Sequence, residues 1–148
     1  MKSISIIIPA FNESALISNT LRAISAWTPP AGCSLKEILV IDDGSHDSTA
    51  AKVGELTAEI SSLKLLVNDG NRGKGFSVRR GVLASEGDII GYTDADLAYD
   101  PAQYNAFIEG ILHQKADIVA GSRHLQYDSG LSHYSRRRVL STYGFQLI

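Results

Sequence analysis

Short apolar runs alternate with longer segments in which apolar residues recur at helical spacing. The runs are rich in β-branched residues, are bounded by turn residues, and lack a clean alternation of apolar and polar positions. Such runs indicate strands that are buried on both faces, as in a parallel sheet covered by helices. Strands are predicted over residues 3–10, 37–41, 63–67, 88–93 and 117–120.

The segments between these strands have the features of helices. Residues 13–27 carry apolar side chains at helical intervals, Asp47 suits the N-cap of the next helix, and Pro101 suits the first turn of another. Helices are predicted over residues 13–27, 48–60, 74–85, 101–113 and 134–147. The alternation of strands and helices predicts an α/β fold with a mostly parallel sheet and helices on both faces, and 148 residues suffice for one domain.

Polar residues cluster directly after four of the predicted strands. The clusters occupy residues 12–13, 42–43, 71–74 and 94–96. In open parallel sheets, ligands bind beyond the carboxyl ends of the strands, which all meet at one edge. We therefore expect the four clusters to form a single site.

Two carboxylates follow the fourth strand, at Asp94 and Asp96. Carboxylates at this spacing can hold a hard divalent cation such as Mg²⁺ or Mn²⁺, which prefers oxygen ligands and often shares them with substrate phosphates. A cation there would neutralise a diphosphate leaving group. The alternative is an ordinary turn, in which Asp is common.

Asp42 and Asp43 follow the second strand, and Gly44 permits a tight turn after them. A carboxylate at this edge can accept hydrogen bonds from a base N–H group or from ribose hydroxyls. The alternative is a strand-to-helix turn with a capping role.

The glycine-rich segment 71–75 contains Arg72 and Lys74 and precedes a predicted helix. Glycines that open the backbone, two cations and a helix N-terminus together suit phosphate binding. The spacing matches neither a Walker A loop nor a dinucleotide fingerprint. A solvated basic turn is the alternative.

Charge is distributed unevenly along the chain. The whole chain has a formal net charge of −2, which argues against non-specific nucleic-acid binding. Residues 1–118 hold 10 Lys and Arg against 15 Asp and Glu, a balance of −5, whereas residues 119–148 hold four arginines against Asp128, a balance of +3. The basic end indicates either an anionic partner or a solvated basic helix.

Cys33 is the only cysteine, which excludes an internal disulfide and fits a reducing, cytoplasmic compartment. The apolar start over residues 4–8 is far shorter than the core of a signal peptide or a membrane span. We expect neither a secretion signal nor a transmembrane segment.

Three motifs together resemble family-2 glycosyltransferases of the GT-A fold, which is Rossmann-like. They are Ile-Ile-Pro-Ala-Phe-Asn-Glu at 7–13, Val-Ile-Asp-Asp-Gly-Ser-His-Asp-Ser-Thr at 40–49 and Asp-Ala-Asp at 94–96. Residues 71–75, 78–81 and 121–123, with Leu97, also look like dolichyl-phosphate glucose and mannose synthases. Those inverting enzymes move a hexose from a nucleotide diphosphate to a polyprenyl phosphate at the cytosolic membrane face.

The resemblance implies roles for residues of the donor site. Mg²⁺ or Mn²⁺ would be held by Asp94 and Asp96, which would also meet the diphosphate of UDP-glucose or GDP-mannose. The nucleotide site would be lined by Pro9, Ala10, Asn12, Glu13 and Asp42. Asp43, Arg72 and Lys74 complete the expected substrate-binding set.

The resemblance also implies an acceptor site near the C-terminal end. Arg123 would hold phosphate in the active site. Arg137 and Ser141, four residues apart and so on one helical face, would bind the acceptor phosphate. With Asp96, these residues form the expected catalytic set. The family's catalytic chains are longer, so we expect one GT-A domain over residues 1–148 that is truncated at its C-terminal end.

The chemistry of the acceptor supports a lipid phosphate. A phosphate monoester carries roughly −1.5 to −2 charge at pH 7 and needs no general base. A sugar hydroxyl needs a base, usually a carboxylate, and beyond Asp100 the chain offers only Glu109, Asp117 and Asp128.

Three alternatives remain. A family-2 transferase to a glycan hydroxyl is one, although the Gln-x-x-Arg-Trp motif of processive synthases is absent. A nucleotide-sugar-binding module without catalysis is the second. A nucleotidyltransferase is disfavoured, because such proteins have a glycine-rich loop with an arginine after the first strand, where this chain has residues 9–13.

Overall fold

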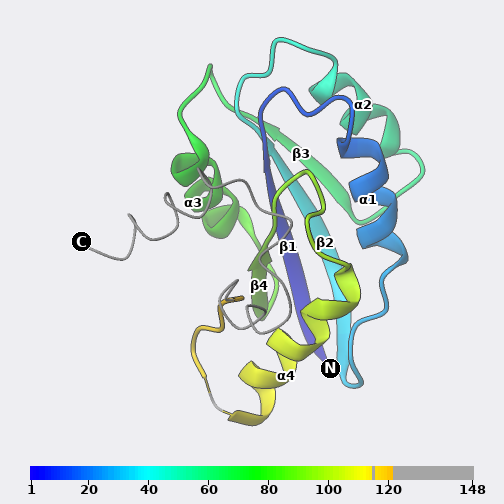
Figure 1. The fold of residues 1–148 in the computed structure, drawn as a ribbon, viewed down its shortest axis with the longest axis vertical. Coiled ribbons are helices and arrows are strands. Elements are labelled where there is room, and N and C mark those ends of the chain that lie inside the picture. Colours follow the sequence, from blue (N-terminus) through cyan, green and yellow to red (C-terminus); the bar gives the residue numbers. More distant parts are fainter. Residues whose placement is uncertain (115, 122–148) are drawn as a thin grey trace, which may run out of the picture.

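The computed structural model describes residues 1–114 and 116–121 (Figure 1). The elements in chain order are β1 (Lys2–Ala10), α1 (Ile17–Ala26), β2 (Cys33–Asp42), α2 (Thr49–Leu56), β3 (Leu63–Val67), α3 (Lys74–Ala84), β4 (Ile89–Tyr92), the 3₁₀ turn η1 (Pro101–Gln103) and α4 (Tyr104–Gln114). In this part of the chain, no helix has the length and apolar character needed to cross a membrane.

The four strands form one parallel sheet in the order β3-β2-β1-β4. The pairing of β1 with β2 shifts register between Ile4 and Ser5, because Lys36 is an extra residue on β2. All four strands run in the same direction, as Figure 1 shows for the sheet as a whole, so their carboxyl ends meet at one edge. The predicted mostly parallel sheet is confirmed.

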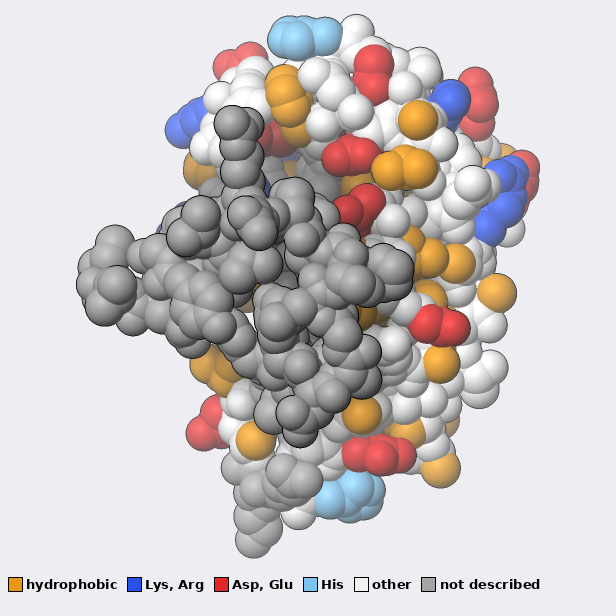
Figure 2. Space-filling model, in the orientation of Figure 1, with side chains coloured by type: hydrophobic (Ala, Val, Ile, Leu, Met, Phe, Trp, Pro, Cys, Tyr) orange, Lys and Arg blue, Asp and Glu red, His pale blue; other side chains and the backbone are white. Residues whose placement is uncertain are grey.

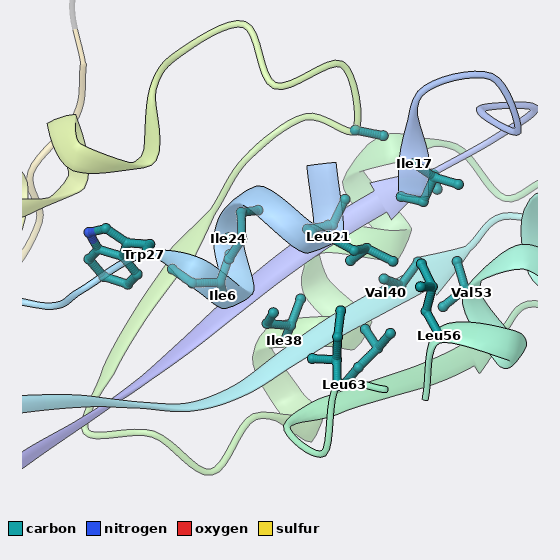
Figure 3. Packing of buried hydrophobic residues seen from close by; sticks show 14 of the residues in the cluster. Ile6, Ile17, Leu21, Ile24, Trp27, Ile38, Val40, Val53, Leu56 and Leu63 are labelled. Carbon is teal, nitrogen blue, oxygen red and sulfur yellow. The ribbon is translucent and has the colours of Figure 1, made fainter. Parts of the chain in front are cut away.

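Successive residues of the central strands enter two separate cores. Ile6 and Val40 pack with residues of α1 and α2 (Figure 3). Ile7 and Ile41 face the opposite side, where α3 lies so close that a Cβ on Gly81 would be 2.4 Å from Ile7 Cγ2. Burial on both faces explains the unbroken apolar runs, and the predicted helices on both faces are confirmed.

Two helix starts differ from the prediction. The first helix begins at Ile17, because the backbone before it forms a turn in which the Glu13 carbonyl accepts from the Leu16 and Ile17 N–H groups. Ser48, not Asp47, is the N-cap of α2. Asp47 nevertheless stabilises the start of α2, since its Oδ1 accepts from the Thr49 N–H at 2.9 Å.

The predicted fifth strand over residues 117–120 is wrong. Residues 116–121 contain no strand, and Ile118 is 85% exposed. Val119 lies beside Gly110 of α4, so this segment packs against a helix instead of extending the sheet. An apolar run of this length does not by itself distinguish these two outcomes. The predicted helix over 134–147 falls outside the described residues.

Candidate active site

The carboxyl ends of the strands bring the predicted polar clusters together. The Asp43 N–H donates to the Ala10 carbonyl at 2.8 Å, and the Asn68 N–H donates to the Asp42 carbonyl at 2.8 Å. These bonds continue the pairing of β1, β2 and β3 past the strand ends, and β4 ends on the other side of β1. The loops after the four strands therefore share one edge of the sheet, as expected from the sequence.

Asp42 has a carboxylate oxygen that lacks a partner. The residue is only 1% exposed. Its Oδ2 accepts from the Ser45 N–H at 3.1 Å, whereas its buried Oδ1 has no hydrogen-bond partner in the described part of the chain. A buried acceptor without a donor is costly and uncommon, so this oxygen is suited to a donor group on a ligand.

Asp43 has the opposite environment. Its carboxylate accepts from Asn68 Nδ2 at 2.6 Å, the Arg72 N–H at 3.0 Å and the Gly73 N–H at 2.7 Å. Burial alone would raise the pKa of Asp43, but the hydrogen bonds from Arg72, Asn68 and Gly73 outweigh it and lower the pKa. Asp43 thus fixes the backbone of the 71–75 loop, and its predicted contact with substrate stays a prediction.

Asn12 connects the loops that follow β1 and β2. Its backbone has a φ of 56°, a conformation that Asn adopts more readily than most residues. Its N–H donates to Ser45 Oγ at 2.9 Å, and its Oδ1 accepts from the His46 N–H at 2.9 Å. The next N–H, of Glu13, donates to Thr49 Oγ1 at 2.8 Å. Asn12 therefore shapes the edge of the site through contacts within the protein.

Carboxylates gather around Glu13. Its pKa is raised by partial burial and by the negative charges of Asp96, Asp47 and Asp94. On the face shown in Figure 2, several acidic side chains lie close together in the upper half. The predicted pair Asp94 and Asp96 thus lies near Glu13, in a region with excess negative charge.

Lys74 partly balances this charge. Its Nζ lies 2.5 Å from Asp94 Oδ1 and 6.0 Å from the centre of the Tyr92 ring. Asp96 Oδ1 accepts from the Ala98 N–H at 3.2 Å. The 71–75 loop and the carboxylate pair are separate motifs in the sequence, and the contact of Lys74 with Asp94 joins them.

The residues present fit a small divalent cation. Asp94 and Asp96 supply hard oxygen donors, and their charges already raise the pKa of Glu13. Within residues 1–114 and 116–121, no group of three or more His, Cys, Asp or Glu could hold a metal. Mg²⁺ is commonly bound through one or two carboxylates with substrate phosphates supplying further ligands, so a two-carboxylate site is sufficient.

The remaining predicted donor residues also lie at this edge. The Arg72 guanidinium lies 4.5 Å from the centre of the Phe76 ring, an arrangement that orients its charge. Pro9 and Ala10 are the last residues of β1, and Ala10 lies opposite Asp42 on β2. Their contact with a nucleotide stays a prediction. Arg123, Arg137 and Ser141 lie outside the described residues.

Sequence reasoning missed several residues that hold the site together. Thr20 of α1 donates to the Ala95 carbonyl at 2.6 Å and so ties down the segment between the two aspartates. The buried residues Asn68 and Ser77 form a hydrogen-bond network behind Asp43 with the half-buried Arg80. The place of Asn68 directly after a strand is a signal for such a role, whereas nothing in the sequence indicates the contact of Thr20.

Comparisons with known proteins agree with this arrangement. The chain is 39% identical to the dolichyl-phosphate beta-glucosyltransferase of Dictyostelium discoideum over an alignment of 155 positions. The alignment covers 97% of this chain and 47% of that protein. It is 29% identical to the undecaprenyl-phosphate 4-deoxy-4-formamido-L-arabinose transferase of Aeromonas hydrophila, over 87% of this chain and 39% of that protein. The chain thus spans less than half the length of these relatives.

A solved structure and a family profile complete the comparison. A mannosyltransferase from Pyrobaculum calidifontis, solved in complex with GDP-Man and Mn²⁺, superposes with a TM-score of 0.55 at 28% identity, over 63% of this chain and 27% of that one. The GT-A fold and the resemblance to polyprenyl-phosphate sugar transferases are therefore confirmed. The profile of Glycosyl transferase family 2 matches residues 5–147, and the chain belongs to that family.

Proposed function

We propose that this chain binds a nucleotide diphosphate hexose, UDP-glucose or GDP-mannose, and transfers the hexose to a polyprenyl phosphate with inversion. The observation that carries the proposal is the presence, at one sheet edge, of two features: a buried Asp42 oxygen that has no donor among the described residues, and the solvent-accessible carboxylates of Asp94 and Asp96. The first suits the N–H of a base, and the second suits a cation-bound diphosphate.

The nucleoside half of the donor would lie against the ends of β1 and β2. Asp42 Oδ1 would accept a hydrogen bond from the base, which removes the cost of its buried, unpartnered state. Pro9 and Ala10 would contact the same nucleoside. Uracil and guanine both present an N–H group to such an acceptor, so this contact leaves the choice of base open.

The diphosphate half would lie between Asp94, Asp96 and the 71–75 loop. Asp94 and Asp96 would hold Mg²⁺ or Mn²⁺, and a bound cation would neutralise charge on the leaving diphosphate. Lys74, which pairs with Asp94, would turn to the diphosphate. Arg72 would add a second positive charge.

The acceptor would be a polyprenyl phosphate, dolichyl or undecaprenyl. A phosphate oxygen would attack the anomeric carbon opposite the departing diphosphate, so the new C–O bond forms as the old one breaks and the configuration inverts. Arg123, Arg137 and Ser141 would hold the acceptor phosphate. A lipid acceptor requires the reaction to take place at a membrane surface, which we propose to be the cytosolic face, with peripheral contact by this chain.

Calorimetric titration tests the donor site. UDP-glucose and GDP-mannose are each titrated with and without Mn²⁺, and we expect one of them to bind in a Mn²⁺-dependent manner. Asp96→Ala should remove that dependence, whereas Glu55→Ala, which changes an exposed carboxylate on α2, should leave it intact. Binding of neither donor to the folded chain, or equal Mn²⁺ dependence in Asp96→Ala, would contradict the proposed site.

An acceptor screen tests the transfer. Product with dolichyl or undecaprenyl phosphate, abolished by Asp96→Ala, is the expected result. Product only with sugars would assign the chain to transfer onto a glycan hydroxyl. Donor binding without turnover on any acceptor would assign it to nucleotide-sugar binding without catalysis.

A further inference from the structure

Arg80 lies on α3 and reaches back to the end of β3. Its Nη1 donates to the Val67 carbonyl at 2.7 Å and to Asn68 Oδ1 at 2.6 Å. Asn68 is only 5% exposed, so this is an interaction of a charged donor with a buried amide. Hydrogen bonds from charged groups are stronger than those between neutral groups.

Arg80 determines which way the Asn68 amide faces. Arginine has donors and no acceptor, so it requires the amide oxygen on its own side. The Asn68 Nδ2 group then points the other way, where it donates to Asp43 Oδ1 at 2.6 Å and to Ser77 Oγ at 2.9 Å. A reversed amide would place its oxygen against the Asp43 carboxylate, which is unfavourable.

Asp43, which accepts from Asn68, also binds the glycine-rich loop. Its two oxygens accept from the Arg72 and Gly73 N–H groups, which fixes the backbone just before α3. Gly44 lies very close to the backbone just before this loop, since a Cβ at Gly44 would lie 2.6 Å from the Gly70 carbonyl carbon. An unbroken series of hydrogen bonds thus leads from Arg80 to the backbone that bears Arg72 and Lys74.

We propose that Arg80 is a positioning residue for the donor diphosphate, acting through Asn68 and Asp43 on the loop that presents Arg72 and Lys74. This inference rests on the proposed function, in which that loop meets the diphosphate. Arg80 does not contact the donor. Its effect falls chiefly on the diphosphate half, because in the described part of the chain the Asp42 carboxylate has no hydrogen bond from Asn68 Nδ2 or Arg80, and Asn68 bonds to Asp42 through the backbone alone.

The matched variants are Arg80→Gln and Arg79→Gln, with Arg80→Lys as the conservative change. Arg79 is the neighbouring residue on α3 and is exposed, so its variant makes the same charge change without touching the network. Affinity is measured by calorimetry for UDP and GDP with Mn²⁺, and by NMR titration for uridine and guanosine. Amide hydrogen exchange of Arg72 and Gly73 is followed in the ligand-free chain.

In Arg80→Gln we expect the nucleotide that binds the unaltered chain to bind about three- to tenfold more weakly, the worth of about one hydrogen bond. The matching nucleoside should bind unchanged, and the Arg72 and Gly73 amides should exchange faster. Arg80→Lys should restore part of both effects, and Arg79→Gln should show neither. A variant that merely loses stability would weaken nucleotide and nucleoside alike.

Two results separate the failure of this inference from that of the proposed function. If the unaltered chain binds a nucleotide and Arg80→Gln binds it equally well, or if its Arg72 and Gly73 amides exchange at the original rate, the inference is overturned and the donor site stands. If the folded, unaltered chain binds neither nucleotide, the proposed function is overturned, and the diphosphate role of Arg80 falls with it.

Discussion

Asp42 and Asp43 are adjacent at the end of β2 but differ in their hydrogen-bond partners. Side chains that follow one another on an extended backbone point in opposite directions, so Asp42 and Asp43 meet different surroundings. Asp43 is surrounded by donors from Asn68 and the 71–75 loop, whereas Asp42 Oδ1 has none in the described residues. The hydrogen bonds of Asp43 stabilise the loop, and we propose that Asp42 recognises the ligand.

The paired variants Asp42→Asn and Asp43→Asn separate these tasks. Asp43→Asn places an amide against the Arg72 and Gly73 N–H groups, so we expect it to lower the free energy of unfolding by about 1–3 kcal/mol. Asp42→Asn should leave the free energy of unfolding unchanged or raise it, and should weaken binding of the preferred nucleotide at least about tenfold. Urea unfolding and calorimetric titration provide the two measurements.

The reverse outcome would reassign the two residues. If Asp42→Asn destabilised the chain as much as Asp43→Asn and bound nucleotide normally, Asp42 would be a structural residue. The sequence offers no means of making this distinction, because both residues belong to the same Asp-Asp-Gly-Ser motif.

Among the elements, α3 joins the core to the 71–75 loop of the site. Its first residue, Lys74, contacts Asp94, its second turn carries Arg80, and Gly81 packs directly on β1. The absence of a side chain at Gly81 lets the helix approach the sheet closely. The distance between α3 and the sheet therefore determines the position of the 71–75 loop.

A pair of glycine substitutions tests this close approach. A Cβ at Gly81 would lie 2.4 Å from Ile7 Cγ2, so we expect Gly81→Ala to lower the free energy of unfolding by about 1–3 kcal/mol through overpacking. A Cβ at Gly54 of α2 meets nothing within 4 Å, so Gly54→Ala should raise that free energy by about 0.4–1 kcal/mol. Equal effects of the two substitutions in thermal or urea unfolding would show that α3 accommodates the methyl group without strain.

Elements whose signals are local could be predicted from the sequence. The four strands of the sheet were predicted because each is a short apolar run, of which the central β1 and β2 are buried on both faces, and three helices were predicted between them. The polar clusters at the strand ends followed from that order. The strand over residues 117–120 was wrong, because whether an apolar run packs beside a strand or against α4 depends on tertiary contacts.

The network of Arg80, Asn68 and Asp43 could not be predicted from the sequence, because it too depends on tertiary contacts. It joins residues from α3, the end of β3 and the end of β2, which the fold alone brings together. An arginine in a helix next to another arginine reads as solvated charge. Only the position of its donors relative to a buried amide shows that Arg80 and Arg79 have different surroundings.

Across the whole molecule, buried and hydrogen-bonded carboxylates connect stability to pH at both ends of the sheet. Asp43 lies at the carboxyl edge. Glu37 lies farther back, 1% exposed, and accepts from Ser5 Oγ at 2.6 Å, the Glu86 N–H at 2.7 Å and Lys64 Nζ at 2.9 Å. Burial alone would raise the pKa of Glu37, but the bonds from Ser5, Lys64 and Glu86 outweigh it and lower the pKa.

The free energy of unfolding of this chain should therefore fall in acid. Asp43 and Glu37 both have a pKa below their unfolded values of about 4, so the stability that their charges supply is present above that pH and is lost as pH falls through the folded values. Glu13, whose pKa is raised, acts in the opposite sense, because protonation removes the cost of partly burying its charge and relieves its repulsion with Asp96. Since two buried, well-bonded groups oppose one, we expect the urea midpoint to fall between about pH 5 and pH 3.

Glu37→Gln should show a smaller fall than the unaltered chain, whereas Glu55→Gln, changed at an exposed position, should match it. A midpoint that stayed constant over this range would mean that these carboxylates keep their bonds when protonated and that their charge contributes nothing to folding.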